Sequence, residues 1–296
     1  MASFDLKSYN NHLLEKVKRN SVLSAFIKKH GFSDDFVLEH INSFYEACKS
    51  LDKCYDCPGL YACTQKKKGE YSTLSYDDVL INEVAYCKYE LERRESENFK
   101  KGYVYSDIPD EYLNVNLDNI GCEDKASAIL YALCSDIYDG TRNKGLYIYG
   151  NFGVGKTYMC YALLNSLVKK GHKVAFVKVD SFIDMMRKLY LSNNDEYSSL
   201  MNKIKKAEYL VLDDIGSEKV SAFSRDDLLF NILDYRMENK LVTIFTSNLG
   251  KNDLLLQYQY DKDDRSSLIK AKRLLERIDI LSDDYVLTGI NKRRKV

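Results

Sequence analysis

The segment GNFGVGKT combines the residue types that bind phosphate groups. It fits the pattern G-x-x-x-x-G-K-[ST] at Gly150, Gly153, Gly155, Lys156 and Thr157. In such a loop the glycines let backbone N–H groups approach phosphate oxygens, because no Cβ atom is in the way. The lysine reaches the β- and γ-phosphates, and the threonine hydroxyl is a ligand for Mg²⁺. This spacing therefore predicts a binding site for a nucleoside triphosphate with Mg²⁺.

The residues around this phosphate loop support the prediction. The apolar run LYIY precedes the loop and the apolar run MCYALL follows it, which gives the required order of strand, loop and helix. The helix beginning near Thr157 directs the positive end of its dipole toward the anion. This order disfavours the alternative, an ordinary strand-to-helix turn. The residues expected to contact ATP are Gly150, Asn151, Phe152, Gly153, Val154, Gly155, Lys156, Thr157 and Tyr158.

Two adjacent carboxylates end another apolar run, EYLVLDDIG. Phosphoryl transfer needs one carboxylate to hold Mg²⁺ and a second to orient the attacking water. We expect Asp213 to take the first role and Asp214 the second, while the alternative is an acidic strand end that caps the next helix. The following run, VTIFTSN, ends in Asn248, a polar side chain that can sense the γ-phosphate. Asp214 and Asn248 are therefore candidate catalytic residues of an ATPase.

The composition favours a globular protein. Hydrophobic residues make up 45% of the chain and charged residues 30%, and no apolar run has membrane-spanning length. The first residues lack the apolar core of a secretory signal, which predicts a cytoplasmic protein with mostly reduced cysteines. Lys+Arg and Asp+Glu number 44 each, so nucleic-acid binding would need a local basic patch.

The apolar runs predict how these residues are held together. LYIYG, KVAFVKV, YLVLDDI, VTIFTSN and YVLTG alternate with helical stretches and are nearly continuous in apolar residues, as in parallel strands covered on both faces. We therefore expect a three-layer α/β domain at residues 116–296. Helical spacing predicts a small helical domain at residues 1–98, and the charged stretch with Pro109 predicts a linker at residues 99–115.

Several motifs together resemble a known family. YGNFGVGKTYM, VLDDIG, RDDLLFNILDYRM, TIFTSN and KAKRLLERI look like the ATPase domain of bacterial replicative helicase loaders of the DnaI/DnaC type, which are AAA+, or additional-strand, ATPases. The resemblance spans about residues 105–296, and SDIPDEYL matches the segment that leads into that domain. The first domain, with CPGLYAC, is similar to the zinc-bearing, helicase-binding domain of the DnaI branch.

The resemblance implies a function. Such loaders bind the replicative hexameric helicase through the first domain, bind ATP and single-stranded DNA through the AAA+ domain, and associate with themselves into a ring or spiral. No membrane is involved. One alternative is a transposition-helper ATPase, which shares the ATPase motifs but lacks the cysteine-bearing domain. Another is an adaptor that is ordered by nucleotide and has no significant turnover.

The resemblance also implies roles for particular arginines. Arg277 in LLERI matches the arginine that completes the ATP site of a neighbouring subunit, and Arg273 is the second choice. Arg293 or Arg294 in NKRRKV falls where a sensor arginine of the same subunit is expected, with a solvated basic tail as the alternative. Arg236 matches a family position for which we assign no role.

The helix SFIDMMRKLY follows the second expected strand of the domain, where this group inserts its element for binding single-stranded DNA. Arg187 and Lys188 could contact phosphates there, and Tyr190 could stack on a base. A solvated basic helix face is the competing interpretation.

Four cysteines form a candidate zinc site. Cys54 and Cys57 form C-x₂-C, which lets two thiolates reach one tetrahedral zinc, and Cys63 and Cys87 follow in the next 30 residues. The DnaI branch carries a histidine between the pair and the last cysteine, whereas the four histidines here are at positions 12, 30, 40 and 172. Either Cys63 supplies the missing ligand, or the site is altered or lost. Free thiols are the other interpretation. The remaining cysteines are expected to be small core residues: Cys48, Cys122, Cys134 and Cys160.

Overall fold

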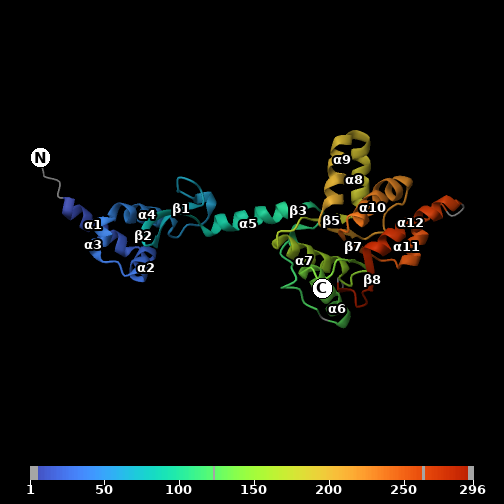
Figure 1. Cartoon of the computed structure of the whole chain (residues 1–296), viewed down its shortest axis with the longest axis horizontal. Helices are drawn as coiled ribbons and strands as arrows, with labels where there is room; N and C mark the ends of the chain where they lie inside the picture. Colours follow the sequence, from blue (N-terminus) through green and yellow to red (C-terminus); the bar gives the residue numbers. More distant parts are fainter. Residues whose placement is uncertain (1–5, 123, 262–263, 293–296) are drawn as a thin grey trace. The chain divides into compact units, whose positions relative to one another are not determined.

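A computed structural model of the chain describes residues 6–122, 124–261 and 264–292. The chain divides between Asn98 and Phe99 into two compact units (Figure 1). The helices and strands of the first unit are α1 (Leu6–Arg19), α2 (Ser21–His30), α3 (Asp34–Glu39), α4 (Ile41–Cys54), a 3₁₀ turn (Leu60–Ala62), β1 (Glu70–Asp77), β2 (Val79–Tyr86) and α5 (Lys88–Gly102), the last of which continues into the second unit.

The helices of the first unit begin and end at residues with clear capping roles. Asn20 accepts backbone N–H bonds at the start of α2, and Gly31 ends that helix in a left-handed conformation with a φ of 68°. Ser33 caps α3 in the same way as Asn20 caps α2. Buried side chains from α1 and α4, Val17 and Phe44 among them, form the core of this unit.

The hairpin β1–β2 is an addition to the helical domain that the sequence predicts for residues 1–98. The strands pair antiparallel from Glu70 opposite Tyr86 to the turn at Asp78, whose φ of 59° an aspartate tolerates better than most residues. Leu74 joins the core beside α4, while Val79 and Ile81 on the other face are 65% and 48% exposed. Because the exposed face of β2 also carries apolar side chains, its pattern lacks the alternation of apolar and polar residues that identifies a half-buried strand.

The second unit contains one sheet with helices on both faces. Its elements are β3 (Tyr103–Ser106), a 3₁₀ turn (Asp110–Tyr112), α6 (Lys125–Asp139), β4 (Gly145–Tyr149), α7 (Lys156–Lys169), β5 (Val174–Lys178), α8 (Val179–Ser192), α9 (Asn194–Lys206), β6 (Tyr209–Asp213), the π-helical segment η3 (Phe223–Leu229), α10 (Phe230–Glu238), β7 (Val242–Ser247), α11 (Lys251–Tyr258), α12 (Arg265–Leu281) and β8 (Ser282–Val286).

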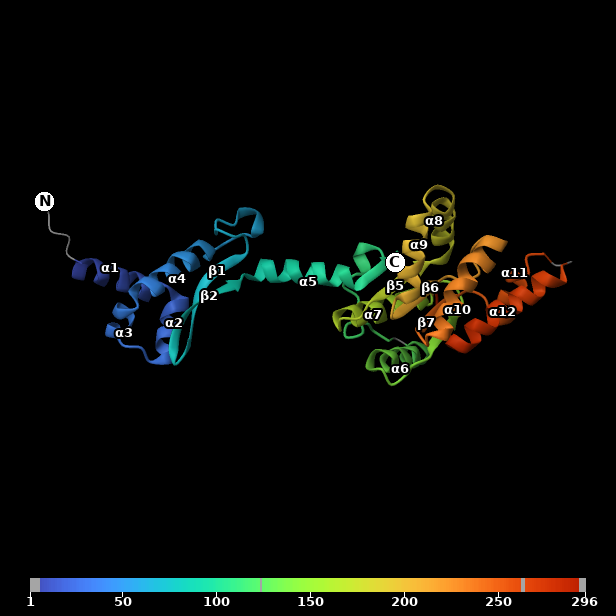
Figure 2. The same cartoon turned by 45° about the horizontal axis from the view of Figure 1, so that its top comes forward.

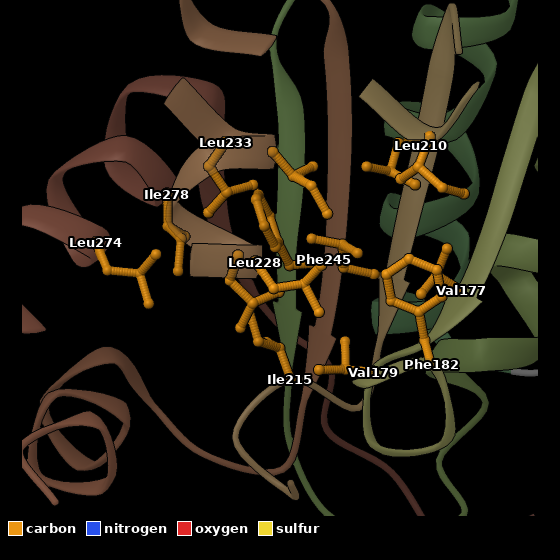
Figure 3. Packing of buried hydrophobic residues seen from close by; sticks show 14 of the residues in the cluster. Val177, Val179, Phe182, Leu210, Ile215, Leu228, Leu233, Phe245, Leu274 and Ile278 are labelled. Atoms are coloured by element: carbon orange, nitrogen blue, oxygen red, sulfur yellow. The ribbon is translucent and has the colours of Figure 1, made fainter. Parts of the chain in front are cut away.

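The sheet has six strands in the order β3-β5-β6-β7-β4-β8, and all neighbouring pairs are parallel. Side chains of alternate residues point to opposite faces. One face, with Val177, Leu210 and Phe245, packs against α8–α12, as Figures 1 and 3 show. The other face, with Ile148 and Val211, packs against α6 and α7. These three layers are the α/β architecture expected from the sequence, and α7, which follows the phosphate loop, is almost wholly buried.

Residues 99–115, expected to be a linker, are part of this second unit. Tyr103–Ser106 forms the edge strand β3, which pairs with β5. Gly102 lies so close to α7 that a Cβ atom there would be 2.4 Å from a methyl carbon of Val168. The charged composition of the stretch predicts solvent exposure, but its aromatic residues Tyr103 and Tyr105 are half-buried against the domain.

Among the described residues, no helix combines the length and the apolar character needed to cross a membrane.

Candidate nucleotide-binding site

The phosphate loop connects the end of β4 to the start of α7. Gly150, Gly153 and Gly155 have φ angles of 147°, 76° and 105°, in the region that residues with a Cβ atom rarely adopt. A Cβ atom at Gly150 would also lie 2.2 Å from the carbonyl oxygen of Leu287. The positive φ angle and the lack of room for a Cβ atom explain why Gly150 is a glycine. The loop then leads directly into the N-terminus of α7 at Lys156.

The Lys156 ammonium is held by the loop itself. It donates to the carbonyl oxygens of Gly150 and Asn151, at 2.8 and 2.9 Å, and to Oδ1 of Asn248, at 2.9 Å. The side chain is therefore ordered at the carboxyl ends of β4 and β7 and is buried. A buried cation held in place loses little conformational entropy when it binds an anionic phosphate.

Asp213 lies at the end of β6 and accepts two hydroxyl hydrogen bonds. Thr157 Oγ1 donates to its Oδ1 at 2.8 Å and Thr246 Oγ1 donates to the same oxygen at 2.6 Å. Burial raises the pKa of Asp213, although both hydroxyl bonds lower it. A threonine hydroxyl and a carboxylate oxygen side by side are ligands that Mg²⁺ prefers, so these residues fit the ion.

Asp214 and Asn248 form the next pair along the same edge. Asn248 Nδ2 donates to Asp214 Oδ1 at 2.7 Å, while its Oδ1 accepts from Lys156. The backbone of Asp214 is left-handed, with a φ of 59°, and its N–H donates to Thr246 Oγ1 at 2.9 Å. This turn places Asp214 beside Asp213 with its carboxylate toward Asn248, so the polar residues from β6 and β7 meet at the loop as the sequence predicts.

These residues line a cavity of ≈ 980 Å³ at the phosphate loop. Loop residues from Phe152 to Tyr158 and the two carboxylates, Asp213 and Asp214, line it. Sequence reasoning missed other parts of the wall, among them Tyr112 and Ile120 before the loop and Leu287 and Lys292 after β8. The backbone N–H of Lys292 donates to the carbonyl of Gly153 at 2.9 Å, so the segment after β8 packs on the loop.

Arg277 lies on α12 and does not line this cavity. Its side chain is 16% exposed, with Nε 3.1 Å from Oδ1 of Asp234 and Nη1 2.9 Å from Glu276. Arg273 lies one turn earlier, is exposed, and covers the ring of Phe230, as Arg277 also does. Arg293 and Arg294 lie outside the described residues.

Arg236 is a buried structural residue. Its guanidinium donates to Thr243 Oγ1 at 2.8 Å, to the carbonyl of Ala207 at 2.7 Å and to the carbonyl of Val242 at 2.7 Å. It also donates to Lys205 O at the end of α9, where helix carbonyls lack partners within the helix. Arg236 therefore joins α9 and α10 to the starts of β6 and β7 rather than contacting nucleotide.

The basic residues of α8 lie away from the phosphate loop. Arg187 donates to Ser221 Oγ at 3.3 Å and lies 5.6 Å from the ring centre of Phe223. Tyr190 is exposed and packs against Tyr197 of α9 and Phe223. Both views show α8 and α9 as a helical pair that extends from the sheet (Figures 1 and 2). Part of the Tyr190 ring is therefore accessible to solvent on the surface of α8.

The four cysteines of the candidate zinc site line one cavity of the first unit, of ≈ 540 Å³. Gly69 connects two of them, because its N–H donates to Cys63 Sγ at 3.5 Å and its carbonyl accepts from the N–H of Cys87 at 2.8 Å. The Tyr89 hydroxyl donates to the carbonyl of Cys57 at 3.0 Å, and Gln65 Nε2 donates to Cys54 Sγ at 3.3 Å.

The same cavity does not hold a formed metal centre. Within residues 6–122, 124–261 and 264–292, no three His, Cys, Asp or Glu side chains are grouped closely enough to hold a metal ion. None of the four cysteines forms a disulfide. The donor types therefore suit zinc, while their side chains are not arranged around a common centre.

Comparisons with known proteins agree with this architecture. The chain is 28% identical over 98% of its length to the "Replicative helicase loader DnaI" of Bacillus subtilis, and the match covers 94% of that protein. The solved structure "Crystal Structure of the DnaI" matches 66% of this chain and 100% of its own, with 30% identity and a TM-score of 0.55. The "Insertion sequence IS21 putative ATP-binding protein" of Pseudomonas aeruginosa is 33% identical over 38% of this chain and 41% of its own length.

These matches confirm the resemblance to replicative helicase loaders that the sequence motifs indicate. The family model described as "IstB-like ATP binding protein" matches residues 62–282, which include the phosphate loop, both carboxylates, Asn248 and Arg277. The chain belongs to this family of ATP binding proteins.

Proposed function

We propose that this protein is an ATP-dependent loader of the replicative DNA helicase. The observation that carries the proposal is the similarity to a helicase loader over 98% of the chain, which includes both units. The insertion-sequence protein is similar over only 38%, so a transposition helper accounts for less of the chain. A loader would act in the cytoplasm, where the replicative helicase and the DNA are found.

The residues at the cavity support ATP hydrolysis. Lys156 and the N-terminus of α7 would bind the outer phosphates, and Thr157 and Asp213, which lie within hydrogen-bond distance of each other, would hold Mg²⁺. The ion supplies positive charge near the transferred phosphoryl group. Asp214 orients the attacking water and accepts its proton, while Asn248 holds both Asp214 and Lys156 in position. These roles require no movement of β6 or β7, because the side chains already lie within hydrogen-bond distance of one another.

The proposal places the helicase contact on the first unit and the single-stranded DNA contact on the second. The exposed face of the β1–β2 hairpin, with Val79 and Ile81, is a candidate contact for the helicase on the first unit. Tyr190 and Arg187 on the α8–α9 pair are candidates for stacking and phosphate contacts with single-stranded DNA. Self-association into a ring or spiral would bring an arginine of one subunit to the ATP site of the next.

The proposal can be tested with the full chain, a replicative helicase hexamer from the same cells and closed circular single-stranded DNA. We expect helicase to be retained on the circles only when both the chain and ATP are present. ATP turnover should also change when the DNA is added. Retention without ATP turnover would instead identify an adaptor, and failure to bind helicase at all would contradict the loader proposal.

We also propose that Cys54, Cys57, Cys63 and Cys87 bind one Zn²⁺. The proposal rests on the cavity that all four line and on the N–H donors directed at Cys54 and Cys63, since such donors stabilise thiolates. Zinc would replace hydrophobic burial as the main stabilising interaction of this small region, because metal binding contributes free energy to folding.

Elemental analysis provides the test for zinc. Freshly prepared reduced protein should contain about one zinc per chain, with four thiolate ligands completing a tetrahedral site. Cys63→Ser should release the metal if Cys63 is a ligand, whereas Cys122→Ser, a change at an exposed cysteine outside the cavity, should not. Absence of zinc in the reduced wild-type protein would contradict the proposal.

We propose Arg277 as the arginine that acts on the ATP of a neighbouring subunit. Arg277→Ala should keep ATP affinity, because the residues around the cavity come from the subunit that holds the nucleotide. It should lower turnover about 10³-fold, because charge on the transferred phosphoryl group is no longer compensated. Mixing Arg277→Ala with Lys156→Ala protein should restore turnover, since some junctions then combine an intact cavity with an intact arginine.

Two further variants separate this role from the ion pair of Arg277. Asp234→Ala removes the same ion pair from its other side, and turnover should survive. If Arg273→Ala abolishes turnover while Arg277→Ala does not, Arg273 has the role. No rescue on mixing, together with turnover independent of protein concentration, would contradict a role in trans for either residue.

A further inference from the structure

A fully buried asparagine connects α7 to the segment that precedes the phosphate-loop strand. The side chain of Asn165 is 0% exposed and uses its whole amide group. Its Nδ2 donates to the carbonyls of Tyr112 and Val115, at 2.8 and 2.6 Å. Its Oδ1 accepts from the Tyr103 hydroxyl at 2.5 Å. Three bonds from one side chain thus hold β3 and the chain after it against α7.

The next residue of the helix extends this attachment. Ser166 Oγ accepts from the N–H of Leu117 at 2.9 Å. Between these bonded points, the ring of Tyr112 stacks on Tyr161, with ring centres 5.2 Å apart, and meets Tyr158 edge-on at 6.1 Å. Both partners of Tyr112 belong to α7, so the position of this ring depends on how the segment is fixed to that helix.

The location of Tyr112 gives this attachment a functional meaning. Tyr112, Ile120 and Tyr158 line the same cavity as the phosphate loop. Lys156 and Thr157 at the start of α7 line the part of the cavity that is expected to bind phosphates. The aromatic and aliphatic side chains of Tyr112, Ile120 and Tyr158 line another part, and such side chains suit the flat, apolar face of a base. One helix therefore carries the phosphate contacts directly and the base wall through Asn165.

We infer that Asn165 is a positioning residue for the nucleoside part of the nucleotide. The inference rests on the proposed binding of ATP. It adds that Asn165 affects the binding of the nucleoside part of ATP and not of its phosphates. Replacing Asn165 by an apolar residue removes the donor of the Val115 carbonyl and leaves the Tyr112 carbonyl with only the N–H of Val115, and losing such half-buried hydrogen bonds is costly. The segment then moves toward water, and Tyr112 moves with it, while the phosphate loop keeps its own hydrogen bonds.

The test compares ATP with inorganic tripolyphosphate, which has the phosphates and no nucleoside. Binding of each to the full chain with Mg²⁺ is measured by calorimetry. For Asn165→Leu we expect the Kd of ATP to rise about tenfold, the effect of one lost buried hydrogen-bonding group. The Kd of tripolyphosphate should stay within about twofold, since it is set by the phosphate loop. Asn202→Leu, a change at an exposed position of α9, should alter neither constant.

A second variant covers the case in which Asn165→Leu does not fold. Tyr103→Phe removes the hydroxyl that donates to Asn165 and leaves the ring in place. It should raise the Kd of ATP about threefold, as expected for one neutral hydrogen bond, without changing that of tripolyphosphate. Equal losses for both ligands, or no loss for either, in the folded variants would overturn the role of Asn165. Wild-type protein that binds neither ligand would instead overturn the proposed nucleotide site.

Discussion

Lys156→Ala is expected to raise the Kd for ATP by a factor of about 10²–10³, because truncating one partner of a buried charge pair is among the costliest changes at a binding site. The ammonium of Lys156 is already held at the loop by the carbonyls of Gly150 and Asn151 and by Asn248. The variant loses both a positive charge and a donor whose position is fixed before ATP binds. Calorimetric titration with Mg²⁺ and ATP measures the change directly.

The control for this experiment lies on the same helix. Lys169 is an exposed residue of the last turn of α7, so Lys169→Ala removes an equal charge far from the loop and should leave the Kd unchanged within about twofold. Both variants should unfold at similar denaturant concentrations. If Lys156→Ala binds ATP with the wild-type constant, the phosphate loop is not the nucleotide site.

Asp214→Asn should lower ATP turnover about 10²–10⁴-fold, the range that a general base contributes. The structure indicates that this substitution preserves the backbone conformation and the hydrogen bond of residue 214. Asparagine adopts the left-handed backbone that Asp214 has, with its φ of 59°, as readily as aspartate does. Its amide oxygen can also accept the bond from Asn248 Nδ2, so only the capacity to accept a proton from water is removed. Single-turnover hydrolysis and ATP binding are measured on the same preparation.

ATP affinity should change little in this variant, since Lys156, Thr157 and Asp213 remain. Asp195→Asn is the matched control, because Asp195 is exposed in the first turn of α9, lies outside the cavity, and would lose the same charge. Turnover of Asp195→Asn should stay within about threefold of wild type, the usual scale of a screened surface charge. Near-normal turnover in Asp214→Asn would show that another group activates the water.

The phosphate end of the site was predictable because its residues are close in sequence or at the ends of strands. Gly153, Lys156 and Thr157 lie within one loop, and parallel strands bring Asp213 and Asn248 to the same edge without further information. The strand cores were equally clear, since both faces of each are buried and the runs are continuously apolar.

The base end was not predictable in this way. Tyr112 is held at the cavity by contacts with α7, among them the bond from Asn165, more than 50 positions later, to its carbonyl, and no local pattern records such a bond. The edge strand β3 is short and lies in a charged stretch, so composition indicated a linker instead. Likewise, the partner of Arg277 is Asp234 on α10, which sequence spacing does not identify.

The order of strands in the sheet has a consequence for synthesis of the protein. The strand that carries the phosphate loop, β4, lies between β7 and β8, both of which are translated long after it. Throughout translation of the intervening residues both edges of β4 lack their final neighbours, although domains usually begin to fold from the N-terminal side. The loop therefore gains its native surroundings only after β8 has been translated. A chain that terminates after β4 but before Ser282 leaves β4 with an unpaired edge, which is a template for pairing with another chain.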